Sequence, residues 1–313
     1  MIRTAAASLL AAGIACTAAP AAEQLQAIAP GVRVFGEPVG GLTLGLARDR
    51  VQTALERPLA IVYRGEVLSV SPGAFGIHAS VDATLRTALS ARARTHVRLR
   101  ATFSHDAVTR YVAWLAARYN RPARSAKVTG ADARGPIVSE SRIGIAVEQA
   151  TLRAAIEQQL ATGARRPLVL LMEAVAPRQT AATLGPVVVI DRSLNTLRLF
   201  DSTRLVRTFH VATGQSVYPT PSGLWRIVDM QQNPWWIPPA SPWAAGAKPV
   251  PPGPGNPLGT RWMGLDAAGV GIQGTPDDAS IGYSESHGCV RMHIPEAEWL
   301  FQHVAVGTPV VIL

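Results

Sequence analysis

The sequence predicts two domains, an α+β domain over residues 31–176 and a mostly β domain over residues 186–313, joined by a linker at 177–185. Three observations predict this division. A chain of 313 residues is long enough for two domains with cores of their own. Helical and strand patterns alternate in the first half, whereas strand patterns dominate after Pro186. Between them, PRQTAATLGP has the composition of a connecting segment.

The first domain opens with a short strand and turn at 31–41. A helix follows Thr43, whose hydroxyl can cap it, because apolar residues recur at helical spacing in TLGLARDRVQTAL. LAIVYRGEVLSV alternates around the turn Arg64–Glu66, which predicts a β-hairpin. Near the end of the domain, RPLVLLMEAV predicts a further strand.

A weak internal repeat runs through this domain. GIHASVDATLRTAL (76–89) is similar to GIAVEQATLRAAI (144–156), and both place Gly-Ile, a valine and an acidic residue before a helical pattern. The first domain is therefore expected to contain partly repeated units. It shows no cluster of catalytic residue types, and we expect His78 and His105 to be surface or capping residues.

The second domain begins with PVVVIDRSLNTLRLFD, which predicts two strands around a turn at Asp191–Asn195. RLVRTFHVATG predicts a strand ended by Gly214, TPSGLWRIVDM a turn and a strand, and GTPVVIL a final strand. Only IPEAEWLFQHV (294–304) has the pattern of a helix. These patterns predict a mostly β domain.

The formal net charge of +9 suits an anionic partner such as nucleic acid, membrane headgroups or an acidic cell-wall polymer. No block of five or six consecutive basic residues occurs, so a nucleic-acid-binding tail is not indicated. Solvated arginines on an ordinary surface would explain the same charge.

The N-terminus has the pattern of a secretory signal peptide over residues 1–21. Arg3 precedes a short apolar run, and Ala19–Ala21 supplies an A-x-A cleavage site. The run is too short to span a bilayer, and no other stretch is apolar enough, so no integral membrane span is expected. Cys16 leaves a lipid-anchored alternative open. Both readings predict export, to the periplasm or the cell wall.

After cleavage, Cys289 would have no intramolecular cysteine partner. A lone cysteine in an exported protein is either a reactive thiol, a partner of another chain or a buried inert thiol. Its setting, SESHGCVRM, is polar and glycine-containing, which is a poor environment for an apolar core.

The same stretch supplies what a nucleophilic cysteine needs. Thiolate is the reactive form, and the charge of Arg291 favours it. Gly288 permits a sharp turn, so that the N–H groups of residues 287–289 could face an oxyanion. In an extended segment, His287 would share a face with Cys289. The pattern predicts cysteine acyl transfer.

A proline-rich segment at 233–257 contains three of the seven tryptophans. Its prolines exclude it from a central strand, and they are also typical of an irregular surface loop. A long loop rich in aromatic residues often forms a binding wall or lid. Trp236 in this loop and Trp262 beyond it are candidate substrate-binding residues.

SHGCVRM, preceded by GIQGTPDDASIG, resembles the catalytic domain of the L,D-transpeptidases (YkuD-like). The resemblance extends through VVVIDRSLNTLRLF, VATG and TPSG and covers roughly 184–313. Residues 31–176 resemble, less strongly, the peptidoglycan-binding domain that often precedes it. The C-terminal resemblance implies a β-sandwich-like fold.

The resemblance also implies a reaction and its partners. Cys289 would attack the carbonyl of the diamino acid in a tetrapeptide stem, D-Ala would leave, and an amine of a second stem would resolve the thioester. Donor and acceptor peptidoglycan stems are thus the implied partners, and the route needs no metal or other cofactor. The signature positions match Ser286, His287, Gly288, Cys289 and Arg291, with the N–H groups of 287–289 as the oxyanion hole.

One position departs from the family pattern. Members usually have I-H-G-T where this chain has Ile272, Gln273, Gly274 and Thr275, and that histidine is the general base. A glutamine amide cannot accept a proton near pH 7, and general-base catalysis contributes roughly 10²- to 10⁴-fold. Gly274 and Thr275 are expected on the substrate side.

A substitute base would have to come from another histidine. His287 is the nearest candidate by sequence, and His210, His293 and His303 are weaker ones. For His303, an interaction with the last carbonyls of its predicted helix is the alternative.

Three functions follow from these residues. The leading hypothesis is an exported L,D-transpeptidase that is slow because of Gln273. The second is a peptidoglycan-binding protein whose catalytic domain is impaired. The third is an L,D-carboxypeptidase in which water resolves the same thioester.

Overall fold

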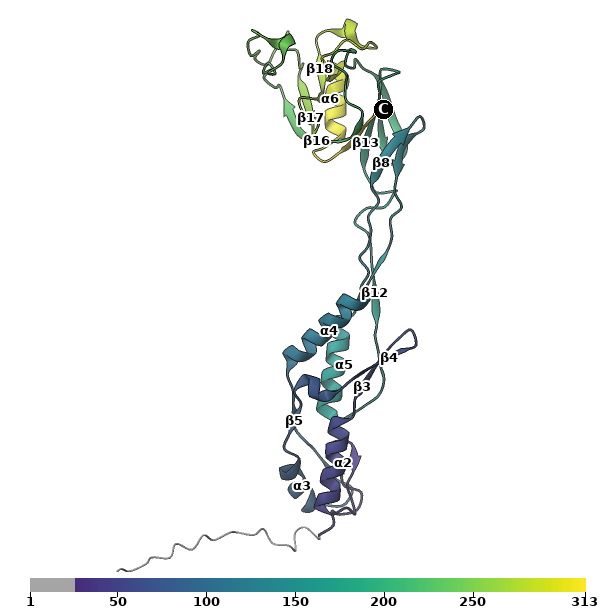
Figure 1. Cartoon of the computed structure of the whole chain (residues 1–313), viewed down its shortest axis with the longest axis vertical. Helices are drawn as coiled ribbons and strands as arrows, with labels where there is room; N and C mark the ends of the chain where they lie inside the picture. Colours follow the sequence, from purple (N-terminus) through teal and green to yellow (C-terminus); the bar gives the residue numbers. More distant parts are fainter. Residues whose placement is uncertain (1–25) are drawn as a thin grey trace, which may run out of the picture. The chain divides into compact units, whose positions relative to one another are not determined.

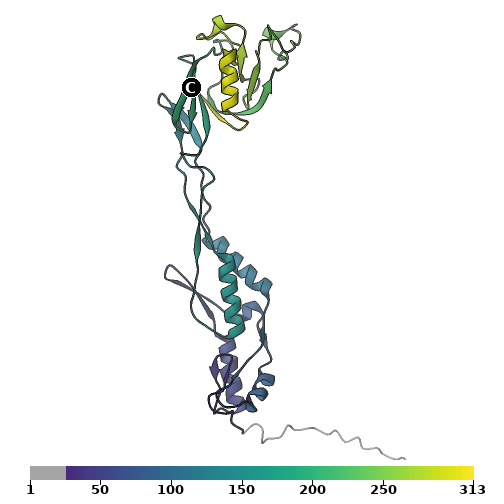
Figure 2. The ribbon, with the colours of Figure 1, turned by 180° about the vertical axis from the view of Figure 1, so that it is seen from behind.

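The computed structural model describes residues 26–313, so the predicted signal peptide and Cys16 lie outside the described range. The chain divides into two compact units (Figures 1 and 2). The first contains the described residues up to Asn120 together with Ala146–Glu173, and the second contains Arg121–Ile145 and Ala174–Leu313. Within residues 26–313, no helix has both the length and the apolar character needed to cross a bilayer.

This division differs from the predicted continuous domain at 31–176. Residues Arg121–Ile145 interrupt the first unit in sequence and belong to the second. The residues predicted as a linker, 177–185, also belong to the second unit. The reason is that Arg121–Ile145 forms a hairpin packed on the sheet of the second unit, as described below.

The first unit combines helices with short strands. Its helices are α2 (Leu44–Glu56), α3 (Val81–Leu89), α4 (His105–Tyr119) and α5 (Gln149–Thr162), with the 3₁₀ turn η1 (Pro72–Phe75). Its strands are β1 (Arg33–Val34), β2 (Glu37–Pro38), β3 (Leu59–Tyr63), β4 (Glu66–Val70), β5 (His78–Ala79), β6 (His96–Val97), β7 (Ala101–Thr102) and β11 (Leu168–Val169). They form small sheets in the orders β2–β1–β6, β11–β3–β4 and β5–β7.

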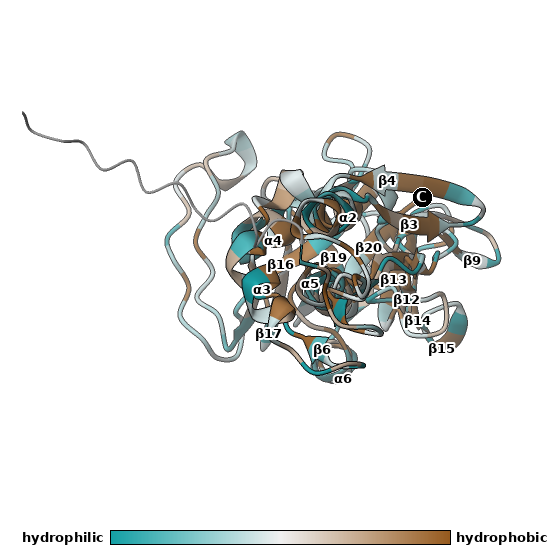
Figure 3. Cartoon of the chain, turned by 90° about the horizontal axis from the view of Figure 1, so that it is seen from below, coloured by the Kyte–Doolittle hydropathy of each residue, from teal (hydrophilic) through white to brown (hydrophobic). Residues whose placement is uncertain are grey.

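Two apolar clusters support this unit. In one, α2 and α3 pack over β1 and β6 through residues such as Val51, Leu85 and Val34. In the other, α4 and α5 lie side by side and cover β3, which is strongly apolar (Figures 1 and 3). Strands β10 (Gly144–Val147) and β12 (Met172–Val175) pair where the chain passes between the units.

Most predicted elements of this unit are present. The hairpin β3–β4 turns at Arg64 and Gly65, which have φ of 48° and 87°. Helix α2 begins after Thr43, but the side chain of Thr43 makes no capping hydrogen bond. Both segments of the predicted repeat form a short strand followed by a helix, β5–α3 and β10–α5. The repeat as a structural unit stays a prediction.

The second unit is built on one eight-stranded sheet with the order β15–β14–β13–β20–β16–β17–β18–β19. The strands are β13 (Pro186–Asp191), β14 (Thr196–Asp201), β15 (Arg204–His210), β16 (Gly223–Gln232), β17 (Arg261–Leu265), β18 (Gly271–Thr275), β19 (Val290–His293) and β20 (Pro309–Ile312). Helix α6 (Ile294–His303) and the 3₁₀ turns η2 (Pro242–Ala244) and η3 (Asp278–Ser280) complete it. The predicted C-terminal helix and the mostly β character are confirmed.

The sheet curls and closes, so the domain is barrel-like rather than the expected sandwich of two sheets. β16 bends at a bulge between Ile227 and Asp229, and pairs with β20 before the bulge and mainly with β17 after it. A bulge of this kind increases local twist and turns a sheet. Beyond β15, Ala212 exchanges two backbone hydrogen bonds of 2.9 Å with Arg291 of β19, which joins the two ends of the sheet.

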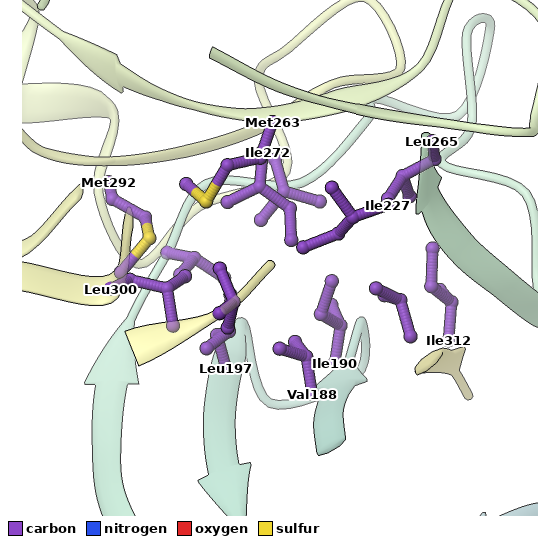
Figure 4. Packing of buried hydrophobic residues seen from close by; sticks show 14 of the residues in the cluster. Val188, Ile190, Leu197, Ile227, Met263, Leu265, Ile272, Met292, Leu300 and Ile312 are labelled. Atoms are coloured by element: carbon purple, nitrogen blue, oxygen red, sulfur yellow. The ribbon is translucent and has the colours of Figure 1, made fainter. Parts of the chain in front are cut away.

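The inner face of this sheet carries the main core (Figure 4). Val188, Ile190 and Leu197 face Ile272 and Met292 from the opposite side of the curled sheet. Helix α6 closes the core through Ala297 and Leu300, both fully buried.

The outer face of β13 is buried as well, which explains its continuous apolar run. Val187 and Val189 point away from the main core and are covered by the hairpin β8 (Val128–Asp132) and β9 (Gly135–Val138). The hairpin approaches closely at Gly135, where φ is 145° and an added Cβ would lie 2.7 Å from the Phe200 ring. Only glycine fits this position.

Candidate functional site

Strands β17, β18 and β19 place three predicted site residues in one row. Trp262 pairs with Gln273, and Gln273 pairs with Arg291. Their neighbours Ile272 and Val290 belong to the core, so this row lies on the opposite face of the sheet. Cys289 immediately precedes β19 at the end of this row.

Cys289 is partly exposed as a residue. Its thiol donates to the carbonyl oxygen of Gly269, at 3.7 Å. Burial raises the pKa of the Cys289 thiol, while the Gly271 backbone N–H and the charge of Arg291 pull that pKa down. Arg291 therefore favours the thiolate, as expected, but burial outweighs this charge and the net pKa is raised.

The ring of Trp262 lies against Gly271, and its predicted role in substrate binding stays a prediction. A Cβ on Gly271 would lie 2.4 Å from the Trp262 ring, so the indole covers Gly271, whose N–H faces the sulfur. The strand therefore needs glycine at 271 for the indole and the thiol to share this space.

The turn before Cys289 is held by hydroxyl groups. Gly288 has φ of 110°, a conformation that favours glycine. Buried Thr220 donates to the Gly288 carbonyl at 2.9 Å and accepts from the Gly214 N–H at 2.8 Å. The hydroxyl of Ser286 donates to the Cys289 carbonyl. Residues 287–289 are bent rather than extended, so the expected shared face of His287 and Cys289 does not form.

The predicted oxyanion hole is only partly available in this arrangement. The Gly288 N–H donates to Ser286 Oγ at 3.1 Å and is already engaged. Within residues 26–313, the N–H groups of His287 and Cys289 have no acceptor. Two of the three predicted donors are thus free to bind an oxygen.

The ring of His287 is held by aromatic residues. It stacks on Trp243 with ring centroids 4.1 Å apart and an angle of 20°, and it lies 5.2 Å from the Tyr218 ring. Desolvation and then the charge of Arg291 lower the pKa of His287. The imidazole is therefore neutral near pH 7 and able to accept a proton.

Trp243 is the site residue that sequence reasoning missed. The proline-rich loop offered three tryptophans, and the sequence carries no signal for which of them turns toward His287. Trp236, the one predicted, contacts Trp243 at a centroid distance of 6.4 Å and is one step farther from His287. Trp235 is 56% exposed.

Gln273 is buried, with 4% of its surface exposed. Its Nε2 donates to the Pro257 carbonyl at 2.9 Å, whereas Oε1 is buried without a hydrogen-bond partner in the described structure. Pro257 ends the proline-rich loop, and neighbouring Asn256 donates to the carbonyls of Pro234 and Pro251. The side chains of Gln273 and Asn256 thus hold the end of the proline-rich loop by hydrogen bonds to its carbonyl groups.

Gly274 and Thr275, expected on the substrate side, are both buried. Thr275 Oγ1 accepts from the Asp277 N–H at 3.2 Å, and an added Cβ on Gly274 would lie 3.3 Å from Ile294. The structure gives both residues packing roles, and substrate contact stays a prediction.

The remaining candidate bases are engaged or distant. His293 Nδ1 lies 2.7 Å from Asp278, and Arg291 lies 3.7 Å from Asp277. His303 Nδ1 lies 2.7 Å from the Trp299 carbonyl, which confirms the expected contact at the end of α6. His210 is an exposed residue at the end of β15. Among residues 26–313, no group of three His, Cys, Asp or Glu side chains is placed to hold a metal ion.

Comparison with protein families matches both parts of the chain. Residues 185–312 match the family described as "L,D-transpeptidase catalytic domain", and residues 69–169 match "Putative peptidoglycan binding domain". These matches confirm the resemblance predicted from the motifs.

Similar curated proteins carry the same description. "Putative L,D-transpeptidase YqjB" of Bacillus subtilis is 35% identical over 133 residues, which cover 41% of this chain and 70% of the relative. "Putative L,D-transpeptidase YkuD" of Bacillus licheniformis is 37% identical over 120 residues, covering 38% of this chain and 61% of the relative. "Probable L,D-transpeptidase ErfK/SrfK" of Salmonella typhimurium is 35% identical over 123 residues, which cover 36% of this chain and 38% of the relative.

Solved structures give weaker likenesses. A crystal structure of a mutant Enterococcus faecium L,D-transpeptidase has a TM-score of 0.37 at 15% identity and covers 86% of this chain and 99% of that chain. An NMR structure of the catalytic domain from E. faecium L,D-transpeptidase acylated by ertapenem has a TM-score of 0.34 at 20% identity. The match covers 41% of this chain and 97% of that chain. On the sequence match, which spans more than two thirds of YqjB, the chain belongs to the L,D-transpeptidase family.

Proposed function

We propose that this protein is an exported L,D-transpeptidase that forms peptidoglycan crosslinks through a thioester on Cys289. The observation that carries the proposal is the position of the sulfur. Cys289 is partly exposed as a residue at the start of β19, near the Gly271 N–H and Arg291, and follows a turn with two free backbone N–H groups. These groups supply the oxyanion donors and part of the positive environment that acyl transfer through a thiolate requires.

In the first step, Sγ would attack the carbonyl carbon of the diamino acid in a tetrapeptide stem. The N–H groups of His287 and Cys289 would bind the oxyanion, the C–N bond to D-Ala would break, and D-Ala would leave with a proton on its nitrogen. In the second step, an amine of another stem would attack the thioester. The new amide forms, and the thiol is released.

The proton acceptor is the weak part of this site. Gln273 occupies the place of the family's base and cannot take a proton. His287 is neutral because its pKa is lowered, and it lies two residues from Cys289. We propose that His287 takes the proton at a reduced rate, so that the enzyme is slow.

Acylation by a carbapenem tests the proposal. The purified protein is incubated with ertapenem, and intact mass is recorded over time for the wild type and Cys289→Ala. One adduct per chain on the wild type and none on the variant is expected. Absence of an adduct after prolonged incubation would refute the proposed thiol chemistry. Incubation with a tetrapeptide stem then separates the products: a crosslinked dimer supports transpeptidation, and a tripeptide alone indicates carboxypeptidase activity.

A second candidate is a peptidoglycan-binding protein without turnover. It is favoured by buried Gln273 and by the raised pKa of Cys289, which both oppose thiolate chemistry. The same mass measurement distinguishes it, because this candidate retains binding to peptidoglycan but forms no adduct.

A further inference from the structure

An open groove of about 710 Å³ lies in the first unit, far along the sequence from Cys289. Its wall is the segment His96–Thr102, and Phe35, Gly36 and the last residues of α5, Ala161 and Thr162, complete it. No acidic side chain is among the residues that line it.

Three basic side chains of the wall project to the same side. Exposure alternates along the segment, with His96, Arg98 and Arg100 exposed, Val97 partly buried and Leu99 only 3% exposed. Residues two apart in an extended chain are separated by about 6.5 Å. The segment therefore presents one imidazole and two guanidinium groups to solvent along the groove.

A fourth basic residue joins this stripe from the neighbouring strand. Arg33 of β1 is paired with His96 of β6, and its guanidinium donates to the carbonyl of Gly36, a groove residue. Within residues 26–313, Arg98 and Arg100 make no ion pair with any carboxylate. These two guanidinium groups are free to bind an anion.

The groove lacks features typical of two other anion-binding surfaces, those for membranes and for single-stranded nucleic acid. A membrane-binding surface combines basic residues with exposed apolar ones, whereas the apolar residues of this segment point inward. Single-stranded nucleic acid is bound on exposed aromatic rings, and the one phenyl ring in the groove, that of Phe35, is 5% exposed. Guanidinium groups pair with carboxylates through two parallel hydrogen bonds.

We propose that His96, Arg98 and Arg100 form a docking groove for the carboxylate-bearing stem peptides of peptidoglycan. The inference rests on the proposed function for the identity of the polymer. It assigns to this groove the retention of the enzyme on the wall, separately from the chemistry at Cys289.

Co-sedimentation with purified sacculi tests the groove. The full chain carrying Cys289→Ala, which prevents turnover, is compared with the same chain carrying Arg98→Gln and Arg100→Gln. Loss of two charge-assisted contacts should weaken binding on the order of tenfold or more. The matched control is Arg110→Gln with Arg153→Gln, exposed arginines of α4 and α5 that lie outside the groove and lower the net charge equally. The control should bind as the parent does.

Chemical blocking of the polymer identifies the ligand. Sacculi whose carboxylates are converted to amides should bind the parent chain weakly. This binding should be as weak as that of the groove variant to native sacculi. The groove variant should bind amidated sacculi no more weakly than it binds native sacculi. Equal loss in the control variant would overturn the proposal in favour of net charge alone. Loss of binding to anionic vesicles with unchanged binding to sacculi would overturn it in favour of a membrane.

The two proposals fail in distinguishable ways. Ertapenem adduct formation, measured in chains that retain Cys289, should be equal with and without the groove substitutions. Absence of the adduct would refute the proposed chemistry and leave the sedimentation result standing, while unchanged sedimentation would refute the groove and leave the adduct standing.

Discussion

The side-chain amide of Gln273 donates a hydrogen bond of 2.9 Å to the carbonyl of Pro257, at the end of the proline-rich loop. This contact gives Gln273 a structural role at the position where the sequence resemblance implies a base. An imidazole at 273 has one nitrogen that could donate the same bond and a second that could accept a proton. The proton could come from Cys289, because residue 273 shares a sheet face with Arg291 and lies in the row that ends at Cys289.

In the Gln273→His variant, Cys289 should therefore be acylated faster than in the wild type. We expect the rate of ertapenem adduct formation to rise by at least about tenfold, a fraction of the roughly 10²- to 10⁴-fold that general-base catalysis contributes. Gln273→Ala is the control, since it removes the amide without supplying a base, and it should not accelerate the reaction. A Gln273→His variant no faster than the wild type would show that the missing base is not what limits the reaction.

The rate of acylation should depend steeply on pH. Burial raises the pKa of Cys289, so the thiolate is the minor form at neutral pH, and its fraction grows about tenfold per pH unit below that pKa. We expect the adduct rate to follow this slope between about pH 6.5 and 8. Arg291→Gln should shift the profile to higher pH, because it removes a charge that lowers the pKa. A rate already constant at pH 6.5 would contradict the raised pKa of the Cys289 thiol.

Trp243 should control the pKa of His287. Removing its indole in Trp243→Ala exposes the imidazole to water, which favours the protonated form, so the pKa of His287 should rise. NMR titration of the imidazole C–H signal measures this. Trp235→Ala, in the same loop but largely exposed, should leave the titration unchanged. A fall in the pKa would mean that the indole face stabilises the imidazolium.

Gly135→Ala should destabilise the second unit. The new Cβ would adopt a strained φ and meet the Phe200 ring at 2.7 Å, and we expect a loss of about 1–3 kcal/mol in the free energy of unfolding. Gly130→Ala in the same hairpin is the control, because nothing lies within 4 Å of its added Cβ. Calorimetry should show a lower transition temperature for Gly135→Ala alone. Equal shifts for both variants would contradict the close packing of the hairpin on β13 and β14.

Local patterns predicted the elements whose signal lies within a short stretch. β13, β14, β20 and α6 were expected from apolar runs, alternation and turn residues, and they lie where these patterns placed them. The segments around β17 and β18 gave no such signal, since glycines interrupt them, and their pairing depends on strands distant in sequence. Helix α4 was also missed, although Ser104 caps its first turn by accepting from the Ala107 N–H.

Local patterns also failed to predict how the chain divides into its two units. Arg121–Ile145 lies inside the first domain by sequence, yet its hairpin covers Val187 and Val189 of the second. An apolar run such as that of β13 is typical of a strand buried on both faces, but it does not indicate which segment provides the cover.

Residue types and spacing alone predicted the chemistry proposed here, from a thiol at 289, a glycine before it, an arginine after it, and an amide where the resemblance implies a base. Three-dimensional packing was needed to set the strength of that chemistry. The thiol pKa is raised because burial outweighs Arg291, Ser286 occupies the Gly288 N–H, and Trp243 rather than Trp236 stacks on His287. Desolvation and stacking depend on atoms brought together from distant strands and loops, and no local pattern encodes their distances.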